Sequence, residues 1–242
     1  MVFLFAILTF FSKFAGGLLA LRYQDRLHLI LALTSGMLVG VVLLDILPEM
    51  ANLAQEFNQP FSQVMIFSAL GFLLFHLAEK TILLHGCTEK DCEDRGHQRV
   101  GILGASGFTI HSFFDGVAMG LSFSTSFSIG VVIAMAVVAH SFADGLNTTA
   151  ILLKNKSNKK QLLTFMTANA LAPFLGVLST SAIRVPQLYL IYLLAFFSGF
   201  FLYMGASDLL PEAHHKHSSF LTMAMTVLGF IFIFVVTRII SV

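Results

Sequence analysis

Charged residues are scarce in this chain of 242 residues, and tryptophan is absent. Asp, Glu, Lys and Arg make up 11% of the sequence, whereas soluble domains usually contain about 25%. We therefore expect a membrane protein, in which Tyr and Phe must supply any aromatic belt at the membrane interface. The net charge of +1 argues against nucleic-acid binding. The two cysteines, Cys87 and Cys92, lie in one polar stretch, so no disulfide framework is predicted.

Long apolar stretches, by contrast, are abundant. Eight of them are long enough to cross about 30 Å of hydrocarbon, near residues 2–21, 28–48, 63–84, 100–123, 129–153, 162–182, 188–210 and 219–240. We predict an all-α integral membrane protein with eight transmembrane helices, forming a single polytopic transmembrane domain over residues 1–242. The first stretch lacks a basic leading segment and a small-residue cleavage site, so we expect a retained helix rather than a signal peptide.

The distribution of Lys and Arg predicts the orientation of these helices. Most of the basic residues fall in the loops that follow stretches 2–21, 63–84, 129–153 and 188–210. Cytoplasmic loops are enriched in Lys and Arg. We therefore expect both termini to be extracytoplasmic.

Two pairs of similar motifs occur in the chain. HSFFDG begins at His111 and HSFADG begins at His140; DILPEMA begins at Asp45 and DLLPEAH begins at Asp208. With the predicted orientation, the two members of each pair lie on helices that cross the membrane in opposite directions. This pattern predicts an inverted repeat, an arrangement in which substrate sites lie near the midplane at the centre of the molecule. The helices over 100–123 and 129–153 would then be the central ones.

The two hexads predict a metal site. A spacing of four residues places His111 above Asp115, and His140 above Asp144, on one face of each helix. If the two helices face each other, two imidazoles and two carboxylates converge, a donor set that suits zinc or a similar divalent metal. An unpaired aspartate in mid-bilayer costs about 3 kcal/mol on insertion scales, and a divalent cation would offset that cost. A structural His–Asp hydrogen bond is the simpler alternative for one such pair, but it explains two matched pairs less well.

A polar loop over residues 85–99 carries a second candidate site. Its His85, Cys87, Cys92 and His97 offer two sulfur and two nitrogen ligands, enough for tetrahedral zinc. Their spacing matches no standard zinc finger, so an ordinary solvated loop on the cytosolic side is an equal alternative.

The eight stretches, the two hexads and the two LPE motifs together resemble the ZIP (Zrt/Irt-like) family of divalent metal transporters, over essentially the whole chain. The resemblance implies a primary transport site formed by His111, Asp115, His140 and Asp144, and it also implies a possible homodimer. Two positions depart from the binuclear pattern of bacterial relatives, because Ser112 and Ser141 stand where those proteins have Asn and an acidic residue. A third departure is Ala172 before a proline, where a Glu is expected, so we expect one central metal rather than two.

The resemblance also implies a pathway on either side of the central site. Asp45 and Glu49 would lie near the outer mouth, where carboxylates concentrate cations. The cytosolic mouth would be lined by a larger set, comprising Asp208, Glu212, His214, His215 and His217, with His76 and Glu79 from stretch 63–84. The simpler alternative is that the two prolines end helices beside solvated acids. Lys13, in the first stretch, is expected to pair with an acid that the sequence does not identify.

We therefore expect a transporter that moves a divalent cation into the cytosol by alternating access, with no catalytic cofactor and no enzymatic activity. Zinc is the preferred substrate, and iron, manganese, cobalt and cadmium are alternatives. An intramembrane zinc hydrolase is the competing hypothesis, although the chain contains no HExxH motif. A proton-coupled carrier without metal is a third hypothesis. Short loops favour a multi-pass protein of a prokaryotic plasma membrane.

Overall fold

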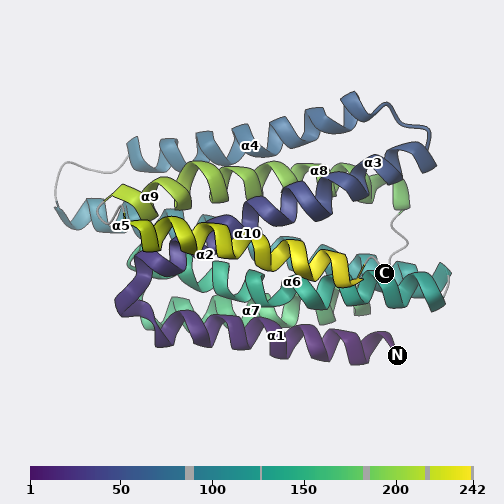
Figure 1. The fold of residues 1–242 in the computed structure, drawn as a ribbon, viewed down its shortest axis with the longest axis horizontal. Coiled ribbons are helices and arrows are strands. Elements are labelled where there is room, and N and C mark those ends of the chain that lie inside the picture. The colour runs from purple at the N-terminus through teal and green to yellow at the C-terminus, as the bar shows by residue number, and fades with distance from the viewer. Residues whose placement is uncertain (85–89, 126, 182–185, 216–218, 241–242) are drawn as a thin grey trace. The chain divides into compact units, whose positions relative to one another are not determined.

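The computed structural model describes residues 1–84, 90–125, 127–181, 186–215 and 219–240 (Figure 1). Over these residues the chain forms helices joined by short connections and no strand. The helices, in chain order, are α1 (Val2–Arg22), η1 (Gln24–Arg26), α2 (Leu27–Val41), η2 (Val42–Ile46), α3 (Leu47–Glu56), α4 (Phe61–Leu84), α5 (Lys90–Thr125), α6 (Phe127–Lys154), α7 (Lys159–Ser179), α8 (Gln187–Leu202), η3 (Tyr203–Leu209), α9 (Leu210–His215) and α10 (Phe220–Ile240).

The helices coincide with the eight predicted stretches, which confirms the all-helical fold class. Within the described ranges, six helical segments have the length and apolarity of a membrane span. Large apolar side chains remain exposed on several of them, such as Phe11 on α1 and Leu74 on α4. So much exposed apolar surface is unusual for a soluble monomer and fits a lipid environment. The two remaining long helices, α5 and α6, carry the hexads.

Three helix boundaries differ from the predicted ones. The LPE motifs do not end their helices: the chain stays helical past Pro48 to Glu56, and past Pro211 to His215. A short π-helix, η2 or η3, precedes each proline. Proline removes one N–H group and crowds the carbonyl one turn earlier, and a π-helical turn is a local adjustment that accommodates this without breaking the helix. Helix α5 begins at Lys90, within the expected loop 85–99, because residues 90–99 contain no proline and a single glycine to oppose a helix.

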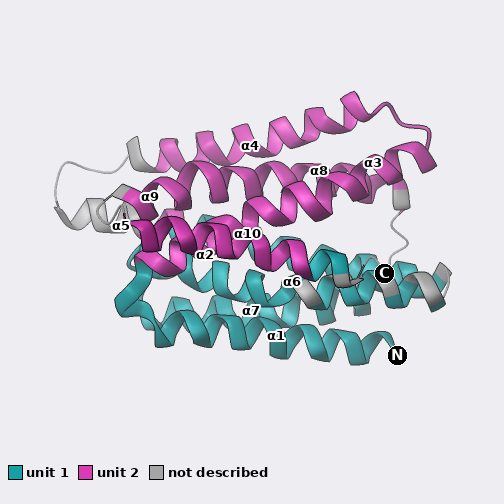
Figure 2. Ribbon diagram, viewed as in Figure 1, with its two compact units in different colours: residues 1–27, 101–184, 236–242 teal, residues 28–100, 185–235 magenta. Residues whose placement is uncertain are grey.

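The chain divides into two compact units (Figure 2). Unit 1 comprises residues 1–27, 101–184 and 236–242. It contains the whole of α1, α6 and α7, and α5 from Gly101 onwards. Unit 2 comprises residues 28–100 and 185–235, and it contains α2 to α4 and α8 to α10, apart from the end of α10. Both hexads belong to unit 1, whereas both LPE motifs belong to unit 2.

Helices pair within each unit through reciprocal glycine contacts. In each pair, a Cβ atom on either glycine would lie about 2 Å from the carbonyl oxygen of the residue three positions before the partner glycine. The pairs are Gly16 with Gly145 (α1 and α6), Gly116 with Gly176 (α5 and α7), Gly36 with Gly229 (α2 and α10), and Gly71 with Gly199 (α4 and α8). The two backbones therefore touch where they cross, and only glycine fits at these eight positions.

Two apolar clusters lie at opposite ends of unit 1. One contains Ala6 of α1, Met119 of α5, Val137 of α6 and Val177 of α7. The other contains Ala105 of α5, Leu152 of α6 and Leu162 of α7, with Leu21 of α1 against it. This order shows that α1 and α6 run parallel to each other, and that α5 and α7 run in the opposite direction. The polar residues at the centre of these four helices therefore lie between two apolar layers.

Candidate metal site

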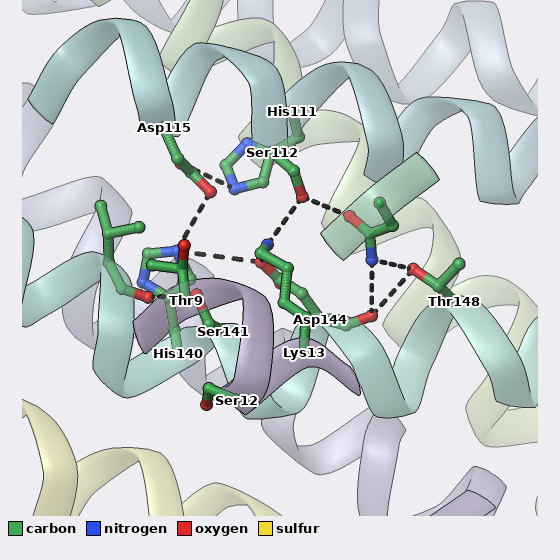
Figure 3. A network of polar contacts seen from close by, with 12 residues as sticks. Thr9, Ser12, Lys13, His111, Ser112, Asp115, His140, Ser141, Asp144 and Thr148 are labelled. Carbon is green, nitrogen blue, oxygen red and sulfur yellow. Dashed lines mark hydrogen bonds and ion pairs between the residues drawn. The ribbon is translucent and has the colours of Figure 1, made fainter. Parts of the chain in front are cut away.

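The two hexads converge in unit 1 (Figure 3). One ligand atom from each of His111, Asp115, His140 and Asp144 lies within 4.8 Å of the other three. Within α5, the His111 Nε2 atom is 3.3 Å from Asp115 Oδ1. Across the two helices, His140 Nε2 is 3.5 Å from Asp115 Oδ2, and it is 4.0 Å from Asp144 Oδ2 in its own helix.

These separations suit a small divalent ion. Two ligand atoms bound tetrahedrally at 2.0–2.2 Å from zinc lie about 3.3–3.6 Å apart, which is close to the observed spacing. Three of the four residues are buried, and the His140 side chain is 12% exposed. Nitrogen and carboxylate oxygen are donors that zinc and similar divalent metals accept. The arrangement can therefore hold one divalent cation away from water.

Lys13 of α1 completes the charged group. Its side chain, 2% exposed as a residue, reaches the hexads from α1 (Figure 3). The Lys13 Nζ atom lies 2.6 Å from Asp144 Oδ2 and donates a second hydrogen bond, of 2.7 Å, to Ser112 Oγ. The acid that pairs with Lys13 is thus Asp144. With neutral imidazoles, one ammonium and two carboxylates leave the group with a single formal negative charge.

A chain of hydrogen bonds connects this group to α7. The Ser112 hydroxyl donates to Asn169 Oδ1 at 2.5 Å. The Asn169 amide donates in turn to Thr148 Oγ1 at 2.7 Å, and Thr148 donates to the Asp144 carbonyl oxygen at 2.8 Å. Ser112 and Asn169 are buried, so these bonds satisfy polar groups that would otherwise be costly. All four helices of unit 1 thus contribute to the site or to its support.

Asn147 and Ser141 are two further buried polar residues of α6. Asn147 follows Asp144 by three residues, on the same helical stripe, and its Oδ1 atom has no hydrogen-bond partner. Ser141 donates to the carbonyl oxygen of Val137 within α6. Ser141 is therefore occupied by its own helix, unlike Ser112.

The residues expected along the pathway lie in unit 2. Asp45 in η2 and Glu49 in α3 are half-buried, as is Asp208 in η3. Glu212 is exposed, and half-buried His214 contacts the carbonyl oxygen of Leu210 through Nδ1 at 3.0 Å. Within the described ranges, no second group of three His, Cys, Asp or Glu residues brings its ligand atoms together as the hexads do.

His76 and Glu79 of α4 both lie near Tyr203 of η3, as does Asp208. The half-buried His76 ring meets the buried Tyr203 ring edge-on, with centroids 5.5 Å apart. Glu79 is buried, and its Oε1 atom lies 3.4 Å from the exposed Lys80 ammonium. His215 lies at the end of α9, but its side chain and all of His217 are outside the described part of the chain.

The expected loop site falls largely outside the described residues. His85 and Cys87 belong to the undescribed segment 85–89. Cys92 and His97 are in the first turns of α5, but their side chains are not described. The zinc site proposed for this loop therefore stays a prediction.

Sequence reasoning missed the partners of Lys13 and the role of Asn169. A lysine inside an apolar stretch was visible as an anomaly, and so was an asparagine in the stretch 162–182. Neither spacing nor composition identifies what such residues contact, because the contact depends on which helices pair. The glycines at positions 16 and 145, which bring α1 against α6, were the only available signal.

Comparison with known proteins gives matches to one family of membrane proteins. The family model described as ZIP Zinc transporter matches residues 76–237. The chain is 29% identical over 126 residues to zinc transporter ZIP10 of Mus musculus, covering 52% of this chain and 15% of that protein. It is 33% identical over 105 residues to zinc transporter ZIP4 of Homo sapiens, covering 43% of this chain and 16% of that protein.

A third relative, zinc transporter ZIP6 of Homo sapiens, is 26% identical over 133 residues, which cover 54% of this chain and 18% of that protein. The matched region thus spans less than a fifth of these relatives. They are vertebrate proteins, so they give no support to the prokaryotic location expected from the short loops. The family match covers most of the chain and includes both hexads and the second LPE motif, and we conclude that this multi-pass membrane protein belongs to the ZIP zinc transporter family.

Proposed function

We propose that this protein carries a divalent metal cation, with zinc as the preferred substrate, into the cytosol through the site formed by His111, Asp115, His140 and Asp144. The observation that carries this proposal is the convergence of these four ligands, three of them buried, within 4.8 Å. The zinc transporters named among its relatives support zinc as the substrate. The same donors also accept iron, manganese, cobalt and cadmium.

Alternating access is the mechanism that best fits a site closed by apolar layers. The clusters around Met119 and around Leu152 lie on either side of the ligands along the helices of unit 1. An ion bound between them must reach water through a change of conformation, first towards one side and then towards the other. Asp45 and Glu49 would attract the ion from outside; Asp208, Glu212, His214 and His76 would receive it on the cytosolic side.

The reciprocal glycine pairs support an inverted repeat. An operation that exchanges α5 with α6 must also exchange α7 with α1, because each glycine pair has to map onto another. Within unit 2, an operation of the same kind would exchange the pair of α2 and α10 with the pair of α8 and α4. That exchange superimposes η2 on η3, each of which precedes an LPE proline.

The homodimer and a cell-membrane location stay predictions.

Membership in a transporter family favours transport over the hydrolase alternative. A metal hydrolase also needs an open coordination position and a base beside the bound water. The two candidate serines are both otherwise engaged, since Ser112 bonds Lys13 and Asn169 while Ser141 bonds its own helix.

Zinc entry into liposomes tests the proposal. The purified protein is reconstituted, and zinc entry is followed with a trapped fluorescent indicator. We expect rapid zinc entry for the wild type and a loss of entry for the double variant His111→Ala and Asp144→Ala, which removes one ligand from each hexad. Lys160→Met, at an exposed position of α7, is the control for substitution in the same unit and should transport like wild type.

Two results would contradict the proposal in different ways. Equal entry in wild type and the double variant would leave transport standing and refute the assignment of the site. No entry of zinc, iron or manganese in the wild type would refute transport itself.

A further inference from the structure

One oxygen of Asp144 faces two competing partners. The Oδ2 atom accepts a hydrogen bond of 2.6 Å from Lys13 Nζ. The same oxygen lies 4.0 Å from His140 Nε2. A metal ion held jointly by His140 and Asp144 would approach this oxygen. The ammonium therefore occupies a position beside the ligand that the metal needs, and the two cations repel each other across a few ångströms of buried protein.

Lys13 cannot simply leave the site. A Cβ atom added to Gly145 would lie only 1.8 Å from the Lys13 carbonyl oxygen, so the α1 backbone packs directly against the residue that follows Asp144. Within that constraint the ammonium has a second partner, the Ser112 hydroxyl at 2.7 Å. Ser112 is itself oriented by its 2.5 Å bond to Asn169. The ammonium thus keeps one hydrogen bond when Asp144 turns to a metal.

We propose that Lys13 is a tethered cation that competes with the transported metal for Asp144 and thereby weakens metal binding at the site. When the site is empty, the ammonium neutralises Asp144 and makes two buried carboxylates tolerable in the membrane interior. When a metal ion enters, Asp144 binds the metal either together with the Lys13 ammonium or instead of it. The nearby ammonium then repels the metal and favours its release. This inference rests on the proposed function and assigns to Lys13 the control of affinity at that same site.

The test compares zinc affinity and zinc transport in three Lys13 variants. Lys13→Met removes the charge and keeps an apolar chain of similar length, Lys13→Gln removes the charge but keeps a donor, and Lys13→Arg keeps the charge. Zinc affinity of the purified protein is measured by competition with a chromophoric chelator, and initial uptake rates are measured in liposomes. Lys160→Met removes the same charge from an exposed position and controls for net charge.

We expect Lys13→Met and Lys13→Gln to bind zinc about tenfold more tightly or better, and to show a lower maximal uptake rate because release becomes slower. Lys13→Arg and Lys160→Met should keep the wild-type affinity. The glutamine variant decides the question if the methionine variant does not fold.

Unchanged or weaker zinc binding in both neutral variants, with the wild type still binding zinc, would overturn the role of Lys13 and leave the metal site intact. Tighter binding in the arginine variant as well would also overturn it, because charge would not be the cause. The His111→Ala variant separates the two hypotheses: if it binds zinc as the wild type does, the site itself is wrong and this inference falls with it.

Discussion

Ser112 connects the candidate metal ligands to a helix that contributes no ligand. Its hydroxyl accepts from Lys13 and donates to Asn169 of α7, so one oxygen orients both an ammonium and an amide. A residue in this position affects the site without touching a metal. Removing the hydrogen-bond partners that orient metal ligands typically changes metal affinity by about 10- to 100-fold.

Substitution of Ser112 by Ala should lower the stability of the protein. The change leaves the buried Asn169 oxygen without its donor, which costs about 1–3 kcal/mol. We expect a melting temperature in detergent about 2–12 °C below that of the wild type. Ser124→Ala is the matched control in the same helix, because the exposed Ser124 hydroxyl only bonds the carbonyl oxygen of Leu121. Equal melting temperatures for the two variants would mean that the bond to Asn169 contributes little.

The residues of the two hexads could be predicted because their spacing is local. Positions 111 and 115 share a helical face whatever the helix packs against, and the repetition at 140 and 144 pointed to a shared purpose. The partner of Lys13 could not be predicted, since it is 131 residues away in sequence and depends on how α1 crosses α6. Long-range contacts of single polar residues leave no periodic pattern.

Four helix pairs cross through the same contact, in which each glycine packs directly against a backbone carbonyl oxygen of the other helix. Gly36 and Gly40 of α2 show how specific this contact is. A Cβ at Gly36 would lie 2.0 Å from the Thr226 carbonyl oxygen, whereas at Gly40 it would meet the Ile233 side chain at 3.1 Å. Backbone cannot move aside as a side chain can.

The variant Gly36→Ala should therefore be much less stable than Gly40→Ala, although the two differ by one turn of the same helix. Overpacking typically costs about 1–3 kcal/mol, and a clash with backbone belongs at the upper end. Thermal unfolding in detergent, compared with the wild type, measures both variants. Similar melting temperatures would show that α2 and α10 separate easily at their crossing. Neither glycine belongs to unit 1, which holds the candidate metal site. Wild-type zinc affinity in both variants would therefore show that unit 1 is still folded.

Helix ends were the least predictable part of the fold. The proline of each LPE motif predicts the end of a helix, yet each helix continues through a π-helical turn. The start of α5 at Lys90 was also missed, because polar residues favour a loop and a solvated helix equally. Apolar stretches specify where the chain crosses the membrane, but they say little about how far a helix extends beyond it.

At the scale of the whole molecule, the candidate metal ligands and the expected pathway residues fall in different units. Every donor of the candidate site, its ammonium and its supporting amide come from unit 1. The LPE motifs, His76 and Tyr203 come from unit 2. The ligands of the site are therefore assembled within one compact unit.

The orientation inferred from Lys and Arg can be tested directly. An epitope tag at either terminus should be accessible on intact cells, because an even number of crossings returns the chain to the side on which it began. A tag inserted at Ser157, in the connection between α6 and α7, should become accessible only after the membrane is permeabilised. Staining of the Ser157 tag on intact cells would reverse the proposed direction of every helix.

The contact between Lys13 and Gly145 gives one residue two tasks. Its backbone seats α1 against α6, and its side chain sets the charge at Asp144. A larger residue at position 145 would push α1 away and withdraw the ammonium with it. A substitution at this crossing therefore alters the helix packing and the charge of the site at the same time. Among homologous sequences, residues 13, 144 and 145 should be substituted together or not at all.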